Sequence, residues 1–270
     1  MKYIIQYLLI FFAGLLFFSC DKVENPIENP NASETPTGPV RKIVIEEFTG
    51  QLCTYCPDGA REIDRLVTVY GEQIIPISVH AGAFAEPSNG APNDFTTTAG
   101  DDYFNQFGPQ GFPAAMISRL NNGAVLGKAQ WEPEILTIKD LAPSASILIT
   151  TNFDSISRQV SIDVETEWLA DVGSGSYNLQ VVVIENHITA YQLDNGTPIN
   201  NYDHKHVLRG AVNTSWGTPI PVTTIGTKDT QSFNYTIDAT WNESNCEIVA
   251  FIYNTSTYEI IQGEIAEVIQ

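Results

Sequence analysis

Positive charge is scarce in this chain of 270 residues, which has 13 Lys and Arg against 32 Asp and Glu and a formal net charge of −19. An acidic surface repels the phosphates of nucleic acid, so the composition disfavours nucleic acid as a partner. It also disfavours docking on anionic lipid through protein charge. The plain alternative is that the acidic residues keep a protein outside the cytoplasm soluble.

Cysteine is also scarce, and the four cysteines are Cys20, Cys53, Cys56 and Cys246. A structural zinc site takes about four ligands, and the chain has no second CxxC that could join Cys53 and Cys56. The sequence also lacks a Ser/His/Asp arrangement, a phosphate-binding loop and a zinc-protease motif. We therefore expect neither a metal nor a cofactor.

A long apolar run stands at the extreme N-terminus, from Tyr3 to Phe18, with Lys2 before it and Ser19-Cys20 after it. Its position, and the charged polar tract that follows, predict an export signal. A small residue before a cysteine resembles a bacterial lipoprotein signal, which implies cleavage after Ser19 and a lipid on Cys20. The alternative is an uncleaved N-terminal anchor. In either case we expect the body of the protein outside the cytoplasm.

After the predicted signal peptide (1–19), composition and hydrophobic pattern divide the chain into three segments. Residues 20–40 are acidic and rich in proline, which predicts a disordered tether. Residues 41–141 carry strand and helix signals in the order β-α-β-α-β-β-α, typical of a small mixed α/β domain, with a hairpin turn expected at 121–123. Residues 143–270 predict an all-β sandwich of about immunoglobulin size. Its apolar runs are 145–151, 158–169, 177–189, 204–212, 230–238, 246–254 and 258–269.

The pair Cys53-Thr-Tyr-Cys56 stands between an apolar strand signal and a helix signal. A helix N-terminus carries partial positive charge, which stabilises a thiolate and lowers the pKa of the first cysteine. Two intervening residues bring the two sulfurs within bonding reach. The pattern therefore predicts a disulfide in which Cys53 is the attacking sulfur of thiol–disulfide exchange and Cys56 the resolving one.

The order strand, CxxC, helix, strand, helix and then a proline that begins a strand resembles the thioredoxin fold. The resemblance implies that Phe112-Pro113 is a cis-proline turn that faces the CxxC and shapes the substrate groove. It also implies that Glu47, six residues before Cys53, is a buried acid that moves a proton at Cys56. The alternative for Glu47 is a solvated acid at a strand end.

Three features depart from the thioredoxin pattern. Leu52 replaces the usual Trp before the first cysteine, Thr54-Tyr55 replaces Gly-Pro inside the motif, and the loop at 83–98 is longer. The redox potential therefore does not follow from the motif.

A closer resemblance covers nearly the whole chain. The signal with its cysteine, EEFTG before CxxC-P, GFP in the middle and DHKHVLRG in the all-β half resemble the 28-kilodalton outer-membrane protein family of Bacteroidetes lipoproteins. This resemblance implies a thioredoxin-like domain followed by an immunoglobulin-like domain, anchored by lipid at the outer membrane and facing the periplasm or the cell surface. Because the family is named mainly for its location, the resemblance implies no biochemical function.

Two further features each leave alternatives open. His204 and His206 are spaced to lie on one side of a strand, which suits either a metal site or a polar strand face with Lys205 opposite. Cys246 opens a predicted strand and is expected to be a buried free thiol, or else one half of an intermolecular disulfide.

Two hypotheses about function remain from the sequence. The first is a thiol–disulfide oxidoreductase that acts on the thiols and disulfides of envelope proteins. The second is a non-enzymatic outer-membrane lipoprotein that binds a protein or matrix partner, with Cys53–Cys56 as a structural disulfide. A buried Cys53 sulfur, or a Pro113 far from it, would argue against the first hypothesis.

Overall fold

The structure is a computed structural model that describes residues 39–270 apart from 89, 174 and 222. The predicted signal peptide, the lipidation site Cys20 and nearly all of the tether lie outside the described residues. Within the described part, no helix is long and apolar enough to cross a membrane.

Helices and strands alternate up to residue 141, and strands predominate after it. The first group comprises β1 (Ile43–Thr49), α2 (Cys56–Tyr70), β2 (Ile74–His80), α3 (Thr98–Phe107), β3 (Ala114–Ile117), α4 (Leu120–Gly123), β4 (Leu126–Gly127) and α5 (Trp131–Ile138). The second comprises β5 (Ala145–Asp154), β6 (Gln159–Trp168), β7 (Tyr177–Glu185), β8 (Ile188–Asp194), β9 (Thr197–His204), β10 (Val207–Ala211), β11 (Thr218–Pro219), β12 (Lys228–Thr236), β13 (Cys246–Asn254) and β14 (Ile260–Glu267). This order agrees with the prediction of an α/β part followed by a β-sandwich.

The helix α2 follows from local signals. Pro57 stands in its first turn, where its missing N–H costs no hydrogen bond. Ile63 and Leu66 are buried on one face and pack against β1, β3 and α5. The helix ends at Gly71, whose φ of 58° suits a residue without a Cβ.

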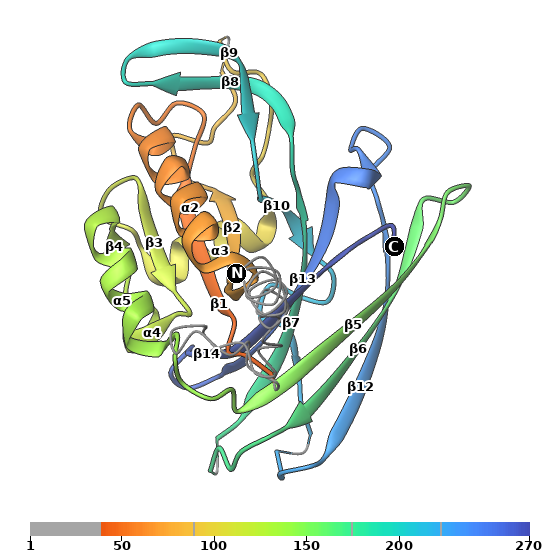
Figure 1. The fold of residues 1–270 in the computed structure, drawn as a ribbon. Coiled ribbons are helices and arrows are strands. Elements are labelled where there is room, and N and C mark those ends of the chain that lie inside the picture. The colour runs from red at the N-terminus through yellow and green to blue at the C-terminus, as the bar shows by residue number, and fades with distance from the viewer. Residues whose placement is uncertain (1–38, 89, 174, 222) are drawn as a thin grey trace, which may run out of the picture. The chain divides into compact units, whose positions relative to one another are not determined.

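Strands from both parts of the chain form one large sheet, in the order β14-β13-β7-β10-β2-β1-β3-β4 (Figure 1). The link between the parts is β10, which pairs with β7 on one side and parallel to β2 on the other, with Val207 opposite Ser78. The boundary predicted near residues 141–143 falls between α5 and β5. Because strand pairing crosses that boundary, the two-domain division stays a prediction.

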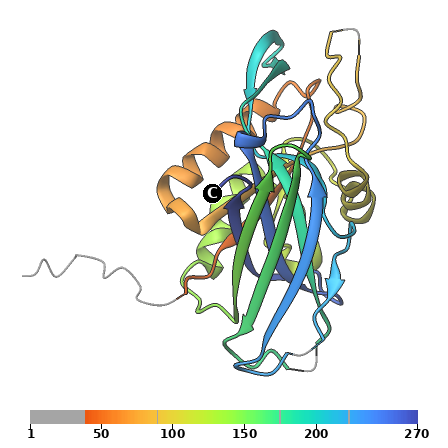
Figure 2. The ribbon, with the colours of Figure 1, turned by 90° about the vertical axis from the view of Figure 1, so that its right-hand side faces the viewer.

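A second sheet, β12-β6-β5, packs on the large sheet and forms the sandwich (Figure 2). The alternation predicted for 160–168 is present, since Val160, Ile162 and Val164 are buried and the residues between them are exposed. These side chains meet residues such as Leu179 and Ile248 from the facing sheet. The half-buried strands therefore follow from the period-2 pattern.

The hairpin predicted around residues 121–123 is present in a longer form, because β3 and β4 pair antiparallel and the connection between them spans residues 118–125. Arg119, Asn121 and Asn122 have positive φ values, so the four residues of α4 form a left-handed turn before β4 and not a regular helix. Arg119 is fully buried and donates to both carboxylate oxygens of Glu46, at 2.7 and 2.6 Å. β3 ends at Ile117, two residues before Arg119.

The strand runs predicted at 177–189 and 204–212 are also interrupted. His187 and His206 have positive φ values and separate β7 from β8 and β9 from β10. The strands β8 and β9 pair with each other as a separate hairpin. The turn between them is Asn195-Gly196, where both residues have positive φ, as a tight hairpin turn requires.

Candidate functional site

Cys53 and Cys56 form a disulfide, with their Cα atoms 5.4 Å apart. Cys56 is the first residue of α2, and Cys53 lies in the turn that precedes the helix, where its amide donates to Gly50 O at 3.0 Å. Both cysteines are buried, with 3% of Cys53 and 2% of Cys56 exposed. The predicted pairing is present, but the burial of Cys53 argues against direct attack by a folded protein.

The β8–β9 hairpin covers the CxxC turn. Its backbone and the Gln192 side chain hold that turn by hydrogen bonds, from Gln192 Nε2 to Cys53 O at 3.1 Å, from Leu193 N to Gln51 O at 2.9 Å and from Asn195 N to Thr54 O at 2.8 Å. In Figure 1 the hairpin lies beside the start of α2. The loop before α3 contacts the same turn, since Leu52 N donates to Phe84 O at 2.9 Å. The CxxC turn is therefore held by both the hairpin and this loop.

Two ion pairs join the hairpin region to the side of α2. Arg61 contacts Asp194 at 3.0 Å, and Lys205 contacts Asp64 at 3.1 Å. Both pairs are partly exposed, so each contributes little to stability.

Glu47 is buried on β1, with 1% of its surface exposed. Burial raises the pKa of its carboxyl group to about 8. Its Oε1 atom has no hydrogen-bond partner among the described residues. The alternative of a solvated acid is wrong, whereas the proton-transfer role stays a prediction.

Pro113 and Gly59 enclose Glu47. The Phe112–Pro113 peptide bond is cis, as predicted, and it precedes β3, which pairs with β1. A Cβ on Gly59 would lie 2.7 Å from Pro113 Cβ and would collide with Glu47 Oε1. The absence of a side chain at Gly59 therefore lets the first turns of α2 approach both residues. The role of Pro113 in shaping a substrate groove stays a prediction.

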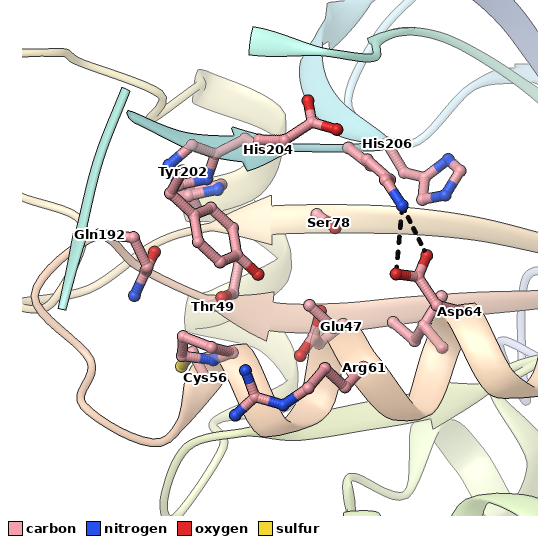
Figure 3. Close-up of a pocket in the computed structure, with 16 residues that line it drawn as sticks. Glu47, Thr49, Cys56, Arg61, Asp64, Ser78, Gln192, Tyr202, His204 and His206 are labelled. Carbon is pink, nitrogen blue, oxygen red and sulfur yellow. Dashed lines mark hydrogen bonds and ion pairs between the residues drawn. The ribbon is translucent and has the colours of Figure 1, made fainter. Parts of the chain in front are cut away.

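A cavity of about 280 Å³ lies between α2, the strands β1 and β2, and the hairpin (Figure 3). Glu47 and Cys56 both line it, and Tyr202 extends over it from β9. Cys53 is not among its 16 lining residues. The other polar lining residues include Thr49, Arg61, Asp64, Ser78, His80, Gln192, His204 and His206.

Three histidines line this cavity in the neutral form. Burial lowers the pKa of His204 and of His206 to about 4, and it lowers the pKa of His80 well below its ordinary value. The prediction that His204 and His206 share a strand is wrong, because His204 ends β9 and His206 lies in the turn before β10. Across the residues that the structure describes, no group of three or more His, Cys, Asp and Glu side chains is placed to hold a metal ion.

Cys246 is a free, buried thiol, as expected. Burial raises its pKa to about 12, and its Sγ donates to Asn242 O at 3.4 Å. A thiol that is protonated and enclosed in this way is inert in exchange.

A sequence model of the family described as outer membrane protein Omp28 matches residues 100–268, more than half of the chain. The chain belongs to the Omp28 family. The family is described as one of outer-membrane proteins, and the predicted relationship is therefore confirmed. The matched region begins after the CxxC, so Omp28 membership by itself says nothing about the disulfide.

Two solved structures from Porphyromonas gingivalis are similar to this Omp28-family chain. HBP35 is 20% identical with a TM-score of 0.68, over 86% of this chain and 76% of that chain. A domain of the outer-membrane lipoprotein Omp28 is 19% identical with a TM-score of 0.34, over 47% of this chain and 96% of that domain. The first likeness shows the fold alone, and the second is too weak for structural argument. No curated protein matches the chain.

The sequence did not predict that Gln192 and Tyr202, which both lie on the β8–β9 hairpin, line the cavity with Glu47 and Cys56. The available signal was Asn195-Gly196, a dipeptide typical of tight hairpins, with strand-forming residues on both sides. That signal could have predicted the hairpin. It could not have predicted that the hairpin covers the CxxC.

Proposed function

We propose that this chain is a thiol–disulfide oxidoreductase of the cell envelope, with Cys53 and Cys56 as the redox couple and Glu47 as the proton carrier. The observation that supports it most is the buried carboxyl group of Glu47, which lines the same cavity as Cys56. A buried carboxyl without a hydrogen-bond partner is costly to the fold. Strongly perturbed acids of this kind cluster at functional sites.

The raised pKa of Glu47 suits proton exchange with a thiol. Its value of about 8 is close to the ordinary cysteine value of about 8.5, so proton transfer between the two groups is nearly balanced in free energy. In the proposed cycle the β8–β9 hairpin first moves away from the CxxC turn, and Cys53 of the reduced protein then attacks a substrate disulfide and forms a mixed disulfide. Glu47 then takes the proton of Cys56, whose sulfur displaces the reduced substrate.

The cellular setting follows from the family and the N-terminal sequence. The proposed site for the lipid is Cys20, which would anchor the protein at the outer membrane through the acidic tether. The proposed substrates are the thiols and disulfides of envelope proteins. The proposed architecture is a thioredoxin-like part (41–141) and an immunoglobulin-like part (143–270), which share the pairing of β2 with β10.

A second candidate function is supported by the burial of the disulfide. In a non-enzymatic lipoprotein that binds a protein or matrix partner, Cys53–Cys56 would be a structural bond. The low exposure of both cysteines and the hydrogen bonds from the hairpin favour this candidate. It leaves the unpartnered Glu47 without a role.

Equilibration with glutathione separates the two candidates. The full-length chain with Cys246→Ser is incubated over a wide range of reduced to oxidised glutathione, and alkylation followed by mass measurement gives the oxidised fraction. We expect a reversible transition between the disulfide and two thiols, and a trapped mixed disulfide with Cys56→Ser. A bond that stays oxidised at every ratio, with no trapped species, would leave only the structural role.

A further inference from the structure

Three buried histidines lie where the β8–β9 hairpin meets the rest of the protein, and together they form a histidine cluster. His80 ends β2, His204 ends β9, and His206 lies in the turn between β9 and β10. The ring centroids of His80 and His204 are 5.6 Å apart. Phe95 packs edge-on against both rings, at 5.1 and 5.2 Å between centroids. Ionisable rings therefore make part of the contact between the hairpin and the body.

The three rings are placed to stay neutral. His204 Nε2 lies 3.1 Å from Tyr191 O, a carbonyl that only accepts, so this nitrogen carries the proton and a second proton would charge the ring at Nδ1. His80 Nδ1 and His206 Nδ1 are buried and have no hydrogen-bond partner in the described part of the chain. A charged imidazole has an N–H at both nitrogens, so a second proton on either of these rings would create a buried donor without a partner.

The charged side chains that face the histidine cluster are already paired with one another. These pairs are Arg209 with Glu185, Asp203 with His187, and Asp64 with Lys205. Arg209 opposes a proton on His80, and the attraction of the two aspartates for a proton on the other rings is outweighed by burial. Glu47, which lines the same cavity, is mostly protonated below about pH 8. It is therefore no counter-ion for a charged imidazole at acid pH.

The hairpin is weakly attached to the body. The strands β8 and β9 form a two-stranded sheet of their own, and such a sheet is only marginally stable by itself. The buried apolar cluster at its base is small and consists of Phe95, Ala190, Val207 and the partly buried Ile188. Elements with few buried apolar contacts open locally while the rest of the fold persists. The hairpin can therefore leave the body without unfolding of the two large sheets.

We propose that protonation of the histidine cluster at acid pH releases the β8–β9 hairpin from the CxxC turn, so that acidity opens the site around the disulfide. Release separates His204 from His80 and gives both rings access to water. It also breaks the hydrogen bonds from Gln192 and Asn195 to the backbone of the turn. The inference rests on the proposed exchange function and adds to it the condition under which the hairpin moves away.

The direction of the effect follows from proton binding. A released histidine has the ordinary pKa of 6.5, whereas burial holds the pKa of His204 at about 4 in the closed structure. The open hairpin therefore binds the proton more tightly, and it gains on the closed form as the pH falls from about 6.5 to about 4. For one released histidine, the ratio of open to closed hairpin rises about twentyfold between pH 7 and pH 5.

Hydrogen exchange measures the release without reference to redox chemistry. The full-length oxidised chain is labelled at pH 7 and at pH 5, and the rates are corrected for the intrinsic pH dependence of amide exchange. We expect the protection of residues 188–204 to fall about twentyfold or more at pH 5, while the protection of β6 is retained. Reduction of the disulfide by a water-soluble phosphine, divided by the rate for the denatured chain at the same pH, should rise over the same pH range.

Variants that cannot be protonated test whether the histidines cause the release. His204→Gln keeps a side-chain N–H for Tyr191 O but cannot become charged, and it should lose most of the fall in protection. His80→Gln removes the charge from the facing ring and should also reduce the fall, which keeps the test valid if His204→Gln loosens the hairpin at both pH values. His187→Gln is the matched control because His187 is exposed, with 62% of its side chain accessible, and it should keep the pH dependence of the wild type.

Each outcome supports or overturns the inference. Hairpin protection that is equal at pH 7 and pH 5, or that falls only together with that of β6, overturns it, as does a fall that is undiminished in both Gln variants of the cluster. Release without faster reduction overturns the claim that acidity opens the disulfide. A released hairpin with a disulfide that never equilibrates with glutathione supports the release and overturns the oxidoreductase. A reversible glutathione titration with a hairpin that stays closed at pH 5 does the reverse.

Discussion

Replacing Glu47 by Gln should make the oxidised protein more stable at alkaline pH and leave its stability unchanged at acid pH. Burial raises the pKa of Glu47 from its ordinary value of 4.5 to about 8. The folded state therefore holds this proton more tightly than the unfolded state, and the free energy of unfolding falls as the pH rises from about 4.5 to about 8. Gln has nearly the same shape and no charge to bury.

The magnitude follows from the difference between the two pKa values. Each pH unit corresponds to 1.36 kcal/mol, so ionising Glu47 in the folded protein costs of order 5 kcal/mol above pH 8. At pH 7 the pH is about 2.5 units above the ordinary pKa of Glu47, so the folded protein is destabilised by about 3 kcal/mol. The free energy of unfolding of the Glu47→Gln variant should therefore exceed that of the wild type by about 5 kcal/mol above pH 8 and by about 3 kcal/mol at pH 7.

The assay is denaturant unfolding of the oxidised proteins between pH 4 and pH 9, followed by tryptophan fluorescence. Glu72→Gln is the matched control because Glu72 is exposed, and its stability difference from the wild type should not grow with pH. A difference between Glu47→Gln and wild type that is the same at pH 5 and pH 8 would refute the reasoning. The same variant should slow thiol–disulfide exchange, since it cannot accept a proton from a thiol.

Three other substitutions test the surroundings of the site. Gly59→Ala should destabilise the protein by about 1–3 kcal/mol in thermal or denaturant unfolding, whereas Gly127→Ala, which has open space around it, should have little effect. Arg119→Ala should cost about 3–5 kcal/mol, because it leaves the carboxylate of Glu46 buried and unpaired; a loss under 1 kcal/mol would contradict the buried pair. Gln192→Ala should raise the rate of disulfide reduction by dithiothreitol about fivefold to tenfold, and an unchanged rate would show that the hairpin does not limit access.

Local patterns determined much of the fold. The strand before the CxxC, the helix α2 and the alternating strand β6 all lie where periodicity and end signals predict them. These elements depend on residues close together in the chain, whose spacing shows which face of an element is apolar. The disulfide belongs to the same class, because two intervening residues bring the two Cα atoms within disulfide range when the chain turns, here to 5.4 Å.

The chemistry of the site was decided by residues far apart in the chain. Alternation shows that Glu46 and Glu47 point to opposite faces of β1, but not what covers each face. The structure gives Glu46 a buried partner in Arg119 and leaves Glu47 unpaired beside Gly59 and Pro113. Glu46 therefore belongs to a buried ion pair, and Glu47 is the candidate proton carrier.

The access to the two cysteines was also a tertiary property. The CxxC motif alone predicts an attacking Cys53 at a helix N-terminus, and that expectation assumes an open surface. The β8–β9 hairpin lies about 140 residues further along the chain, binds the backbone of the CxxC turn and lines the cavity beside Glu47 and Cys56, and both cysteines are buried in the folded protein. A pattern of residues describes what an element can do locally, whereas exposure, desolvation and pairing depend on whichever distant element packs against it.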